Sequence, residues 1–560
     1  MLILMKVLPL RYPTFAVLLV LGWSIAPLFG AELPFHRGVN LTNWFQASGP
    51  RQIQFTQFCR QDLVNIRSLG CDVIRLPINL HGMTGGAPEY TLDPLFLGFL
   101  DRVVDWAEEL QIHLILDNHS FDPAGDTSGT IGEVLIPVWT QMAQHYRDRS
   151  KYLYYEVLNE PHGIADATWN SIQQRVVDAI RAVDQVHTIV IGPAGWNSYD
   201  NLKYMPQYRD PNLIYTFHFY DPFLFTHQGA SWASPSMVSL SGVPFPYDAT
   251  AMPTCPDDLK GTWVEGALNT SYRTEGTAAH VKELIDRAVS FRDQRRWPVR
   301  LLCGEFGVYI PNSDPGQRVT WYRLVRGYLE EKGIAWTTWD YTGGFGLFAT
   351  GGNDLFEHDL NVSLLEALDF NVPEQTKYTP KPDSQGFDLY TDYVAAHVLE
   401  SSGVGDGTLD YYCGTDPVQG QYCIYWTGSG QYCQIGFNFK PDKDLSNLVA
   451  QGYAVDLWIR GDSPGSRLDI RFVDTKTGAD DHPWRMRVRI DEGRAAWDGA
   501  WHHVRVPLAD FKEHGSWDNG WFNPQGKFDW TAVDRFEIVS EYHTLEGIRF
   551  WFDDIRVVEP

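Results

Sequence analysis

The first two thirds of the chain alternate between two patterns of apolar and polar residues. Short apolar runs, such as RGVNLTNW and YLYYEVLNE, predict β-strands, whereas residues 94–110 and 168–186 place apolar side chains three and four positions apart and predict amphipathic helices. Strands that alternate with helices favour a parallel sheet, and eight strands favour its closure into a (β/α)8 barrel. An open, doubly wound sheet is the alternative, but no glycine-rich phosphate loop supports it. The eight predicted strands are residues 37–44, 72–79, 112–120, 152–160, 188–196, 213–221, 299–307 and 335–342.

The pattern changes after about residue 371. Residues 372–386 are polar and rich in proline, which is typical of a linker. From residue 387 onward, short strands of alternating apolar and polar residues dominate, as in 453–461 and 467–474, and no long helical pattern separates them. The predicted fold class is therefore an α/β TIM barrel followed by an all-β jelly-roll sandwich.

One stretch of the predicted barrel, from about residue 221 to 277, is long and has no clear periodicity. Long insertions after barrel strands usually shape the face on which ligands bind. This one contains His227, Trp232 and Trp263, so we expect it to form a wall of a binding cleft.

The N-terminus has the features of an export signal. Lys6 and Arg11 precede an apolar run at 15–29, which small residues follow, and we expect cleavage near Ala31. An uncleaved signal anchor is the alternative, although the run is short for a membrane-spanning helix. The expected organisation is a signal peptide at 1–31, a barrel domain at 32–371, a linker at 372–386 and a sandwich at 387–560.

Composition narrows the range of partners. The chain has 45 basic and 70 acidic residues, a formal net charge of −25, which repels nucleic acids and anionic membranes but not a neutral polysaccharide. Aromatic residues make up 14% of the chain and include 21 tryptophans. Most of these will be core residues, but tryptophan is also the side chain on which flat sugar rings stack.

The seven cysteines show no zinc-binding spacing such as CxxC, so we expect no metal site and no cofactor. Export permits disulfide bonds, and the odd number leaves at least one thiol unpaired within the chain. Cys413, Cys423 and Cys433, ten residues apart, are the most favourable to include a bridge.

Two glutamates stand at the ends of apolar strands. Glu160 lies in VLNEPHG and Glu305 lies in VRLLCGEFG. Side chains at the C-terminal ends of barrel strands converge on one site, and an ionisable group there is costly unless it is paired or functional. Ion pairing at strand ends is the alternative for each glutamate alone. Together they fit glycosidic bond cleavage with retention, which needs two carboxyl groups about 5–5.5 Å apart.

Around these glutamates the chain resembles glycoside hydrolase family 5, the cellulase-like family of retaining barrel enzymes. The resemblance covers most of residues 35–350, and its ordered set of motifs is far more specific than any one of them. It rests on Arg75 in IRLP, His119 in LDNHS, Asn159 and Glu160 in NEP, His218 and Tyr220 in FHFY, Glu305 in GEFG, and Trp339.

The resemblance implies a role for each catalytic residue. Glu160 would be the general acid and then the base, and Glu305 would be the nucleophile. Asn159 would hydrogen-bond the 2-hydroxyl group of the sugar that is cleaved. Arg75 and Tyr220 would donate toward Glu305 and keep it ionised.

The remaining residues would tune the acid or bind sugar. His218 would lie beside Glu160, and Trp339 would be a stacking platform on the non-reducing side. His119 would bind a sugar hydroxyl, although a histidine satisfied within the core is an equally good interpretation. Further substrate-binding candidates are His227 and Trp232, in a segment similar to one in bacterial β-glucanases, and Trp196; Trp44 is a weaker stacking candidate that could equally be core.

These observations predict a secreted or extracytoplasmic, monomeric, retaining endo-β-1,4-glucanase. Its partners would be β-glucan polysaccharides or oligosaccharides, with no nucleic acid and no stable membrane partner once the signal is cleaved. A β-mannanase, a xyloglucanase and an exo-β-1,3-glucanase remain alternatives within the family, and a non-catalytic carbohydrate-binding protein is the alternative of another class. No GxSxG follows a strand, so a serine hydrolase has little support.

The C-terminal domain also leaves two interpretations open. Its last strand, RFWFDDIRVVE, resembles that of many jelly-roll carbohydrate-binding modules, but the domain could equally be a spacer that packs on the barrel. Its tryptophans alternate with polar residues, so most of them fit a core better than a binding face. The candidates are Trp426, Trp458, Trp484, Trp501, Trp517, Trp521 and Trp530.

Overall fold

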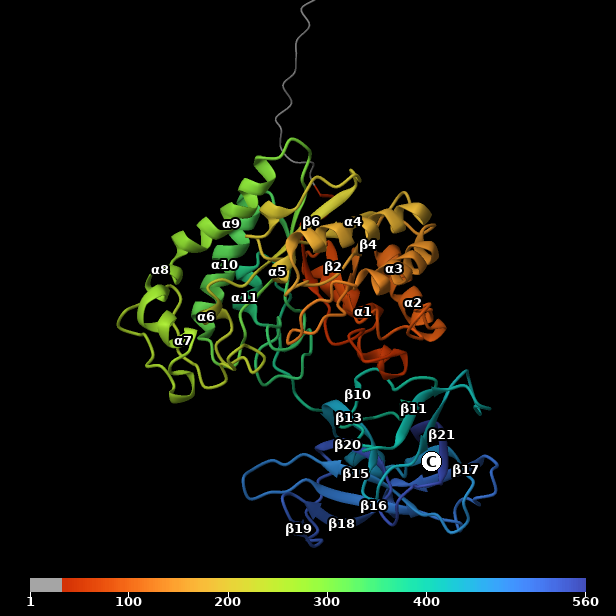
Figure 1. Ribbon diagram of the computed structural model, residues 1–560. Helices are drawn as coiled ribbons and strands as arrows, with labels where there is room; N and C mark the ends of the chain where they lie inside the picture. The colour runs from red at the N-terminus through yellow and green to blue at the C-terminus, as the bar shows by residue number, and fades with distance from the viewer. Residues whose placement is uncertain (1–32) are drawn as a thin grey trace, which may run out of the picture.

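A closed barrel of eight parallel strands forms the first part of the chain in the computed structural model, which describes residues 33–560 (Figure 1). The strands pair in chain order, and β1 pairs with β8 to close the barrel. The barrel prediction is confirmed, whereas the predicted signal at 1–31 lies outside the described residues. The strands are β1 (Arg37–Asn40), β2 (Val73–Ile78), β3 (His113–Asn118), β4 (Leu153–Glu156), β5 (Thr188–Ile191), β6 (Leu213–Phe219), β7 (Leu301–Phe306) and β8 (Ala335–Thr338).

Amphipathic helices surround the barrel. In α2, for example, Asp93 caps the first turn by accepting from the backbone N of Leu95 at 2.7 Å, Pro94 occupies the first helical position, and the helix ends at Gln111 in a left-handed conformation. No helix among the described residues is long and apolar enough to cross a membrane. The principal helices are α1 (Arg60–Ser68), α2 (Pro94–Leu110), α3 (Gly132–Tyr146), α4 (Asp166–Val183), α9 (Ala278–Asp293), α10 (Pro315–Glu331) and α11 (Val362–Ala367).

The observed strands are shorter than the apolar runs that predicted them. The run at 152–160, for instance, contains only the four residues of β4. Val157 and Leu158 remain buried beyond the end of β4, where only Val157 N still donates to β5, to the carbonyl oxygen of Val190 at 3.1 Å. Burial, rather than sheet pairing, therefore sets the length of the apolar run, and Glu160 stands four residues beyond the end of its strand.

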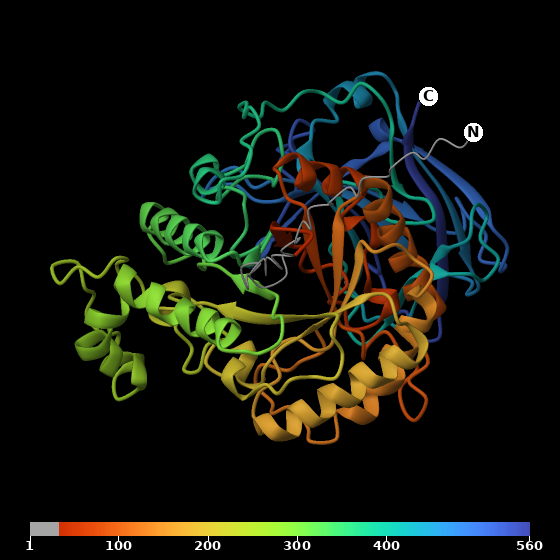
Figure 2. The same cartoon turned by 90° about the horizontal axis from the view of Figure 1, so that it is seen from above.

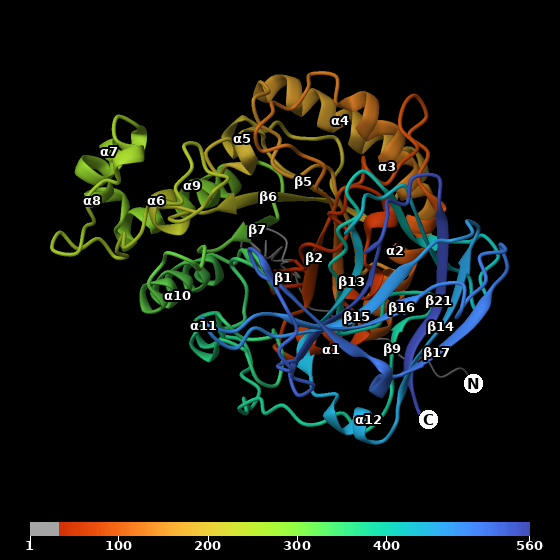
Figure 3. The same cartoon turned by 90° about the horizontal axis from the view of Figure 1, so that it is seen from below.

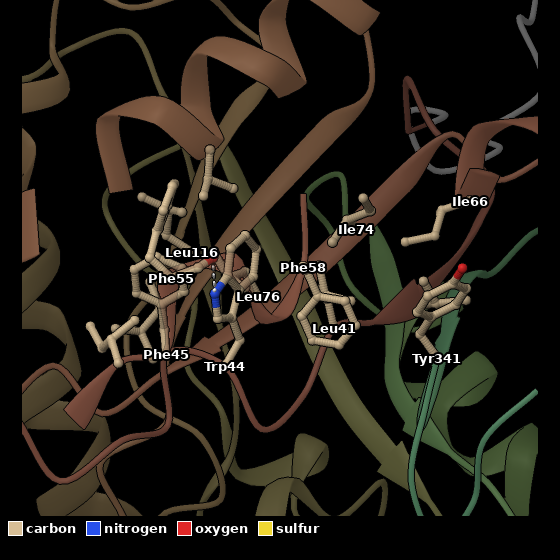
Figure 4. Packing of buried hydrophobic residues seen from close by; sticks show 14 of the residues in the cluster. Leu41, Trp44, Phe45, Phe55, Phe58, Ile66, Ile74, Leu76, Leu116 and Tyr341 are labelled. Atoms are coloured by element: carbon tan, nitrogen blue, oxygen red, sulfur yellow. Dashed lines mark hydrogen bonds between the residues drawn. The ribbon is translucent and has the colours of Figure 1, made fainter. Parts of the chain in front are cut away.

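The loop that follows β1 folds back over the barrel end and carries its own aromatic cluster (Figure 4). Trp44 is only 1% exposed, and its indole Nε1 donates to the carbonyl oxygen of Phe55 at 3.1 Å. Its ring also packs on Phe45 and Phe58. Trp44 is therefore a core residue, and its candidacy as a stacking platform was wrong because the loop turns its ring inward.

The segment from 221 to 277 projects to one side of the barrel, near the ends of the strands (Figures 1 and 2). It is not entirely irregular, since short helical turns interrupt it. They are α6 (Phe223–Thr226), a 3-10 turn (Asp257–Leu259), α7 (Trp263–Gly266), a π-helical turn (Ala267–Ser271) and α8 (Tyr272–Glu275).

The C-terminal region contains two antiparallel sheets packed face to face, which confirms the predicted all-β domain. Apolar residues of alternate positions, such as Ile470 and Phe472 of one sheet and Leu457 and Ile459 of the other, fill the space between them. One sheet contains β10 (Val398–Glu400), β13 (Gln434–Lys443), β20 (Val533–Val539), β15 (Leu468–Asp474), β16 (Trp484–Ile490), β18 (Lys512–Trp517) and β19 (Trp521–Phe522). The other contains β11 (Thr408–Cys413), β12 (Cys423–Thr427), β21 (Arg549–Val558), β14 (Ala454–Gly461) and β17 (His502–Pro507), with β9 (Phe387–Tyr390) paired to β21.

The sandwich packs against the end of the barrel at which the strands finish (Figures 1 and 3). Arg51, in the loop after β1, donates to both carboxylate oxygens of Asp410 at 2.9 and 2.8 Å. The Tyr412 ring packs edge-on against Phe99 of α2, with ring centroids 5.0 Å apart. The C-terminal domain is thus fixed beside the face on which barrel enzymes bind their ligands.

All seven cysteines are free thiols. Cys413 and Cys423 lie directly opposite each other on β11 and β12, but the predicted bridge among the last three cysteines is not formed.

Candidate active site

A cleft of about 590 Å³ opens at the C-terminal ends of the barrel strands. All the predicted site residues line it except Arg75, which lies beneath its floor. The lining contains His119, Asn159, Glu160, Trp196, His218, Tyr220, His227, Trp232, Glu305 and Trp339.

Glu305 is aimed into the cleft by a bulge in β7. The register with β6 changes from Phe217 opposite Cys303 to His218 opposite Glu305, so Gly304 is an extra residue. Bulges of this kind commonly redirect a side chain near an active site. The Glu305 carboxylate then accepts from Arg75 Nη1 at 2.7 Å and from the Tyr220 hydroxyl at 2.9 Å. Two donors, one of them a cation, therefore hold the carboxylate in place.

Glu160 reaches the cleft from the loop after β4. Its backbone has a φ of 45°, in the left-handed region, which costs a non-glycine residue about 1–3 kcal/mol. Its Oε1 lies 2.8 Å from Nδ1 of His218. Burial raises the pKa of Glu160 to about 7, so the group is poised to hold a proton near neutral pH. The two carboxyl groups thus differ, one held by donors and the other favoured in its protonated form.

His218 lies between the two carboxylates. Its Nδ1 is 3.5 Å from an oxygen of Glu305 as well as 2.8 Å from Glu160. Burial lowers the pKa of His218 to about 4, so the ring is neutral at pH 7. A side chain at Gly304 would have its Cβ 3.2 Å from His218 Nε2 and 2.6 Å from Thr216 Oγ1, which explains why glycine occupies the bulge.

Arg75 forms the floor of the site from the middle of β2. It is fully buried, and it contacts Glu156 with Nε at 2.8 Å and with Nη2 at 2.9 Å, as well as Asp117 at 3.0 Å. Burial opposes its charge, but these carboxylates and Glu305 outweigh that effect and raise the pKa of Arg75 well above its usual value. Arg75 therefore holds a structural ion pair as well as donating to Glu305, the role that the resemblance implied.

Asn159 and His119 are positioned from the same floor. Asn159 Oδ1 accepts from Arg75 Nη2 at 2.8 Å, which turns its amide nitrogen toward His119 Nε2, 3.5 Å away. His119 Nδ1 lies 2.7 Å from Asp117 Oδ2, and the ring stacks on Trp339 with centroids 5.5 Å apart. His119 thus lines the cleft and supports the Trp339 ring.

Exposed aromatic rings form the walls. Trp196 is 51% exposed and stacks on His162, with centroids 4.6 Å apart and planes 10° apart. Trp232 is 50% exposed and packs edge-on against Tyr309. His227 is buried and stacks on Phe223 with centroids 3.9 Å apart, so it supports the wall more than it presents a face.

Several residues at the site were not predicted from the sequence. Asn40 accepts from Arg75 Nη1 at 3.0 Å. Its position as a polar residue at the end of the first apolar strand could have identified it from the sequence. His162 follows directly after the NEP motif. Phe223, at the start of α6, and Phe345, in the loop after β8, also line the cleft.

Within residues 33–560, two groups of side chains have the spacing of metal ligands. They are Glu160, His218 and Glu305 in the cleft, and Asp469, His514 and Glu541 in the sandwich, each with ligand atoms within 4.8 Å of one another. Guanidinium groups compete with a cation at both places. Arg75 binds Glu305, while Arg487 binds Asp469 at 2.8 Å and Arg471 binds Glu541 at 3.2 Å. The arrangement therefore suits carboxylate chemistry without a metal better than metal binding.

Two parts of the chain match known protein families. Residues 37–344 match the model of Cellulase (glycosyl hydrolase family 5), and residues 408–559 match that of Carbohydrate binding domain 30. Endoglucanase 3 of Fibrobacter succinogenes is 30% identical over 340 residues, which are 56% of this chain and 51% of that protein. Endoglucanase H of Acetivibrio thermocellus is 29% identical over 517 residues, which are 88% of this chain and 51% of that protein. The chain spans about half the length of these two relatives.

The barrel is also similar to solved structures. The crystal structure of the cellulose synthase subunit Z of Clostridioides difficile is 23% identical and superposes with a TM-score of 0.50. The superposition covers 60% of this chain and 99% of that one, and it shows a shared fold.

Proposed function

The protein belongs to glycosyl hydrolase family 5, the cellulase family. We propose that it cleaves internal bonds of β-1,4-linked glucan and retains the configuration of the anomeric carbon. The spacing of the two carboxylates carries this proposal. Oxygen atoms of Glu160 and Glu305 lie within 4.8 Å of each other, closer than the carboxyl groups of enzymes that place a water molecule for direct attack. This spacing supports a double displacement, since inverting enzymes need carboxyl groups about 6.5–9.5 Å apart.

In the first displacement, Glu305 attacks the anomeric carbon while protonated Glu160 donates its proton to the departing glycosidic oxygen. The bond between that oxygen and the anomeric carbon breaks, and a glycosyl ester of Glu305 forms. Arg75 and Tyr220 donate to the Glu305 carboxylate and hold it in the orientation for attack. Asn159 lines the cleft, and its amide nitrogen donates to the 2-hydroxyl group of the sugar.

In the second displacement, ionised Glu160 removes a proton from water. The oxygen of this water attacks the anomeric carbon from the face on which the leaving group had stood. The ester bond breaks and Glu305 returns to its carboxylate form. Neutral His218, 2.8 Å from Glu160, can donate to it when it is ionised and accept from it when it is protonated. Two inversions give a product with the β configuration.

The open cleft supports action within a polymer. The half-buried Trp339 and the exposed Trp196 and Trp232 all line the cleft with the two carboxylates. We expect barley β-glucan and carboxymethyl cellulose to be cut with a rapid loss of viscosity, and mannan, xyloglucan and β-1,3-glucan to be poor substrates. A reducing-sugar assay on this panel tests the assignment. A preference for mannan or xyloglucan would favour those alternatives, and no release from any glucan would favour a binding protein.

The rate should depend on the protonation of Glu160. Burial raises its pKa to about 7, and the first displacement needs the protonated form, which predominates below that pH. We therefore expect kcat/KM on β-glucan to fall about tenfold per pH unit above pH ~7. In Glu160→Gln, assayed with a dinitrophenyl cellobioside that needs no acid, this alkaline limb should be absent. A limb that persists in the variant would assign the titration to another group.

We also propose that the C-terminal sandwich binds β-glucan, as its match to Carbohydrate binding domain 30 supports. Of its candidate tryptophans, Trp426 and Trp484 are fully buried, whereas Trp517 and Trp521 on β18 and β19 are 59% and 45% exposed. Exposed neighbouring indoles suit stacking on a sugar chain. Trp458, Trp501 and Trp530 are half-buried.

Removing both exposed indoles tests this second site. In a Glu305→Gln background, which prevents digestion, Trp517→Ala/Trp521→Ala should lose most of the retardation that β-glucan causes in native gels. Tyr204→Ala, which removes a 55% exposed aromatic ring from the barrel outside the cleft lining, is the control. Equal retardation of the two variants would support the spacer interpretation instead.

A protein that acts on polysaccharide must meet it outside the cytoplasm, so we propose that the chain is exported and acts as a monomer. Fractionation of the producing cells and size-exclusion chromatography test these two points.

A further inference from the structure

A second hollow lies where the loop after β1 meets the edge of the sandwich. It encloses about 330 Å³, and both domains contribute to it, because Glu400 ends β10 while the other lining residues come from the barrel. Five of its side chains are carboxamides and one is a carboxyl group. The lining contains Asn43, Trp44, Gln46, Ala47, Gln52, Gln54, Gln57 and Glu400.

Gln54 joins the two sides of the hollow. Its Nε2 donates to the carbonyl oxygen of Val398 at 2.7 Å, and its Oε1 accepts from the backbone N of Glu400 at 3.0 Å. The backbone of β10 is therefore fixed against the barrel loop. Among the described residues, the carboxylate of Glu400 has no hydrogen-bond or ion-pair partner, and neither has the carboxamide of Gln57. Polar groups thus remain available inside a rigid frame.

The hollow neighbours the cleft on the side of Trp339. Asp340 follows Trp339 and accepts from the Thr42 hydroxyl at 2.7 Å. Asn43, the next residue after Thr42, lines the hollow, and its amide nitrogen lies 3.3 Å from the Thr42 hydroxyl. The segment that carries Trp339 is therefore in direct contact with the segment that lines the hollow.

The chemistry of the lining selects the class of ligand. Each carboxamide offers both donors and an acceptor, which suits the hydroxyl groups of a sugar. The carboxyl group of Glu400 accepts hydrogen bonds when it is ionised. An apolar ligand would leave these groups unpaired, which costs about 1–3 kcal/mol each. A polyanion would meet a chain with a net charge of −25.

We propose that this hollow is a distal binding site for the glucan chain, at which the C-terminal domain contributes Glu400 directly to substrate binding. The inference rests on the proposed hydrolysis of β-glucan. The site is separate from the exposed tryptophans of β18 and β19. Only a chain that extends beyond Trp339 reaches it, so it increases the rate on long substrates relative to short ones.

The test compares two substrates of different length. In the full-length protein, Glu400→Leu and Gln57→Leu should each lower the ratio of kcat/KM for cellohexaose to kcat/KM for an aryl cellobioside by about 3- to 10-fold, as expected for one or two lost hydrogen bonds. Glu546→Leu, which removes an exposed carboxyl group elsewhere on the sandwich, should keep the wild-type ratio. Gln57→Leu leaves the Gln54 contacts to β10 intact. It therefore tests the site even if Glu400→Leu changes how the sandwich packs on the barrel.

The outcomes separate the two proposals. If the wild-type protein hydrolyses both substrates and neither Glu400→Leu nor Gln57→Leu changes the ratio, the distal site is wrong and the proposed function stands. If the wild-type protein hydrolyses neither substrate nor β-glucan, the proposed function fails and the distal site fails with it. A lowered ratio in both variants, with the control unchanged, supports the site.

Discussion

Glu305→Gln is expected to lower turnover of every substrate by at least about 10⁴-fold, because an amide cannot form the glycosyl ester on which both displacements depend. That loss corresponds to about 5.5 kcal/mol of transition-state stabilisation. An activated leaving group should not restore the rate, since the defect lies in the nucleophile. Reducing-sugar release from β-glucan and dinitrophenol release from an aryl cellobioside measure the two cases.

The control for this substitution is Glu89→Gln, which makes the same change at an exposed glutamate of the barrel and should keep wild-type activity. Circular dichroism should show that Glu305→Gln is folded, because Arg75 retains Glu156 and Asp117 as partners. A folded Glu305→Gln protein that keeps more than about a hundredth of the wild-type rate would remove Glu305 from the role of nucleophile.

Glu160→Gln should separate the two displacements. A dinitrophenyl glycoside leaves without a proton, so Glu305 should still be glycosylated, whereas the next step stalls because no base activates water. A covalent intermediate should therefore accumulate after an initial burst, and mass spectrometry of the intact protein would detect it. On β-glucan, whose leaving group needs a proton, the same variant should lose about 10²- to 10⁴-fold in rate.

Azide provides the decisive control for Glu160→Gln. It is already an anion and needs no base, so it should restore turnover of the aryl glycoside and give a β-glycosyl azide. Proton NMR of the first product of the wild-type protein should show the β anomer. An initial α anomer would mean direct attack by water, and the pairing of Glu160 with Glu305 would have to be abandoned.

The order and number of the barrel strands could be predicted from the sequence, but the residues at which they end could not. All eight barrel strands lie within the apolar runs that predicted them, because a strand buried on both faces leaves a continuous apolar signal. The ends of the strands could not be predicted in this way. Val157 and Leu158 are buried beyond the end of β4, so the same signal continues into the loop that carries Glu160.

At the candidate site, the motif residues could be predicted because each stands in a short, distinctive context such as NEP or GEFG. Their supports could be predicted only in part. Asp117 and Glu156 can be expected, because a buried Arg75 needs carboxylate partners. Phe345 cannot, because it reaches the cleft from a loop whose path depends on tertiary contacts. The bulge at Gly304 leaves no periodic signal, since one inserted residue only shifts the register.

The docking of the sandwich has a consequence for how such proteins evolve. Where a flexible linker joins an additional domain that makes no contact with the catalytic domain, recombination can replace the additional domain alone. Here Gln54 and Arg51 of the barrel are matched to β10 and to Asp410 of the sandwich. A recombinant that joined this barrel to a foreign sandwich would leave the barrel loop without its partners. The barrel loop and the sandwich strands that it contacts should therefore be inherited together. Substitutions in the loop and in those strands should be correlated among proteins that descend from this architecture.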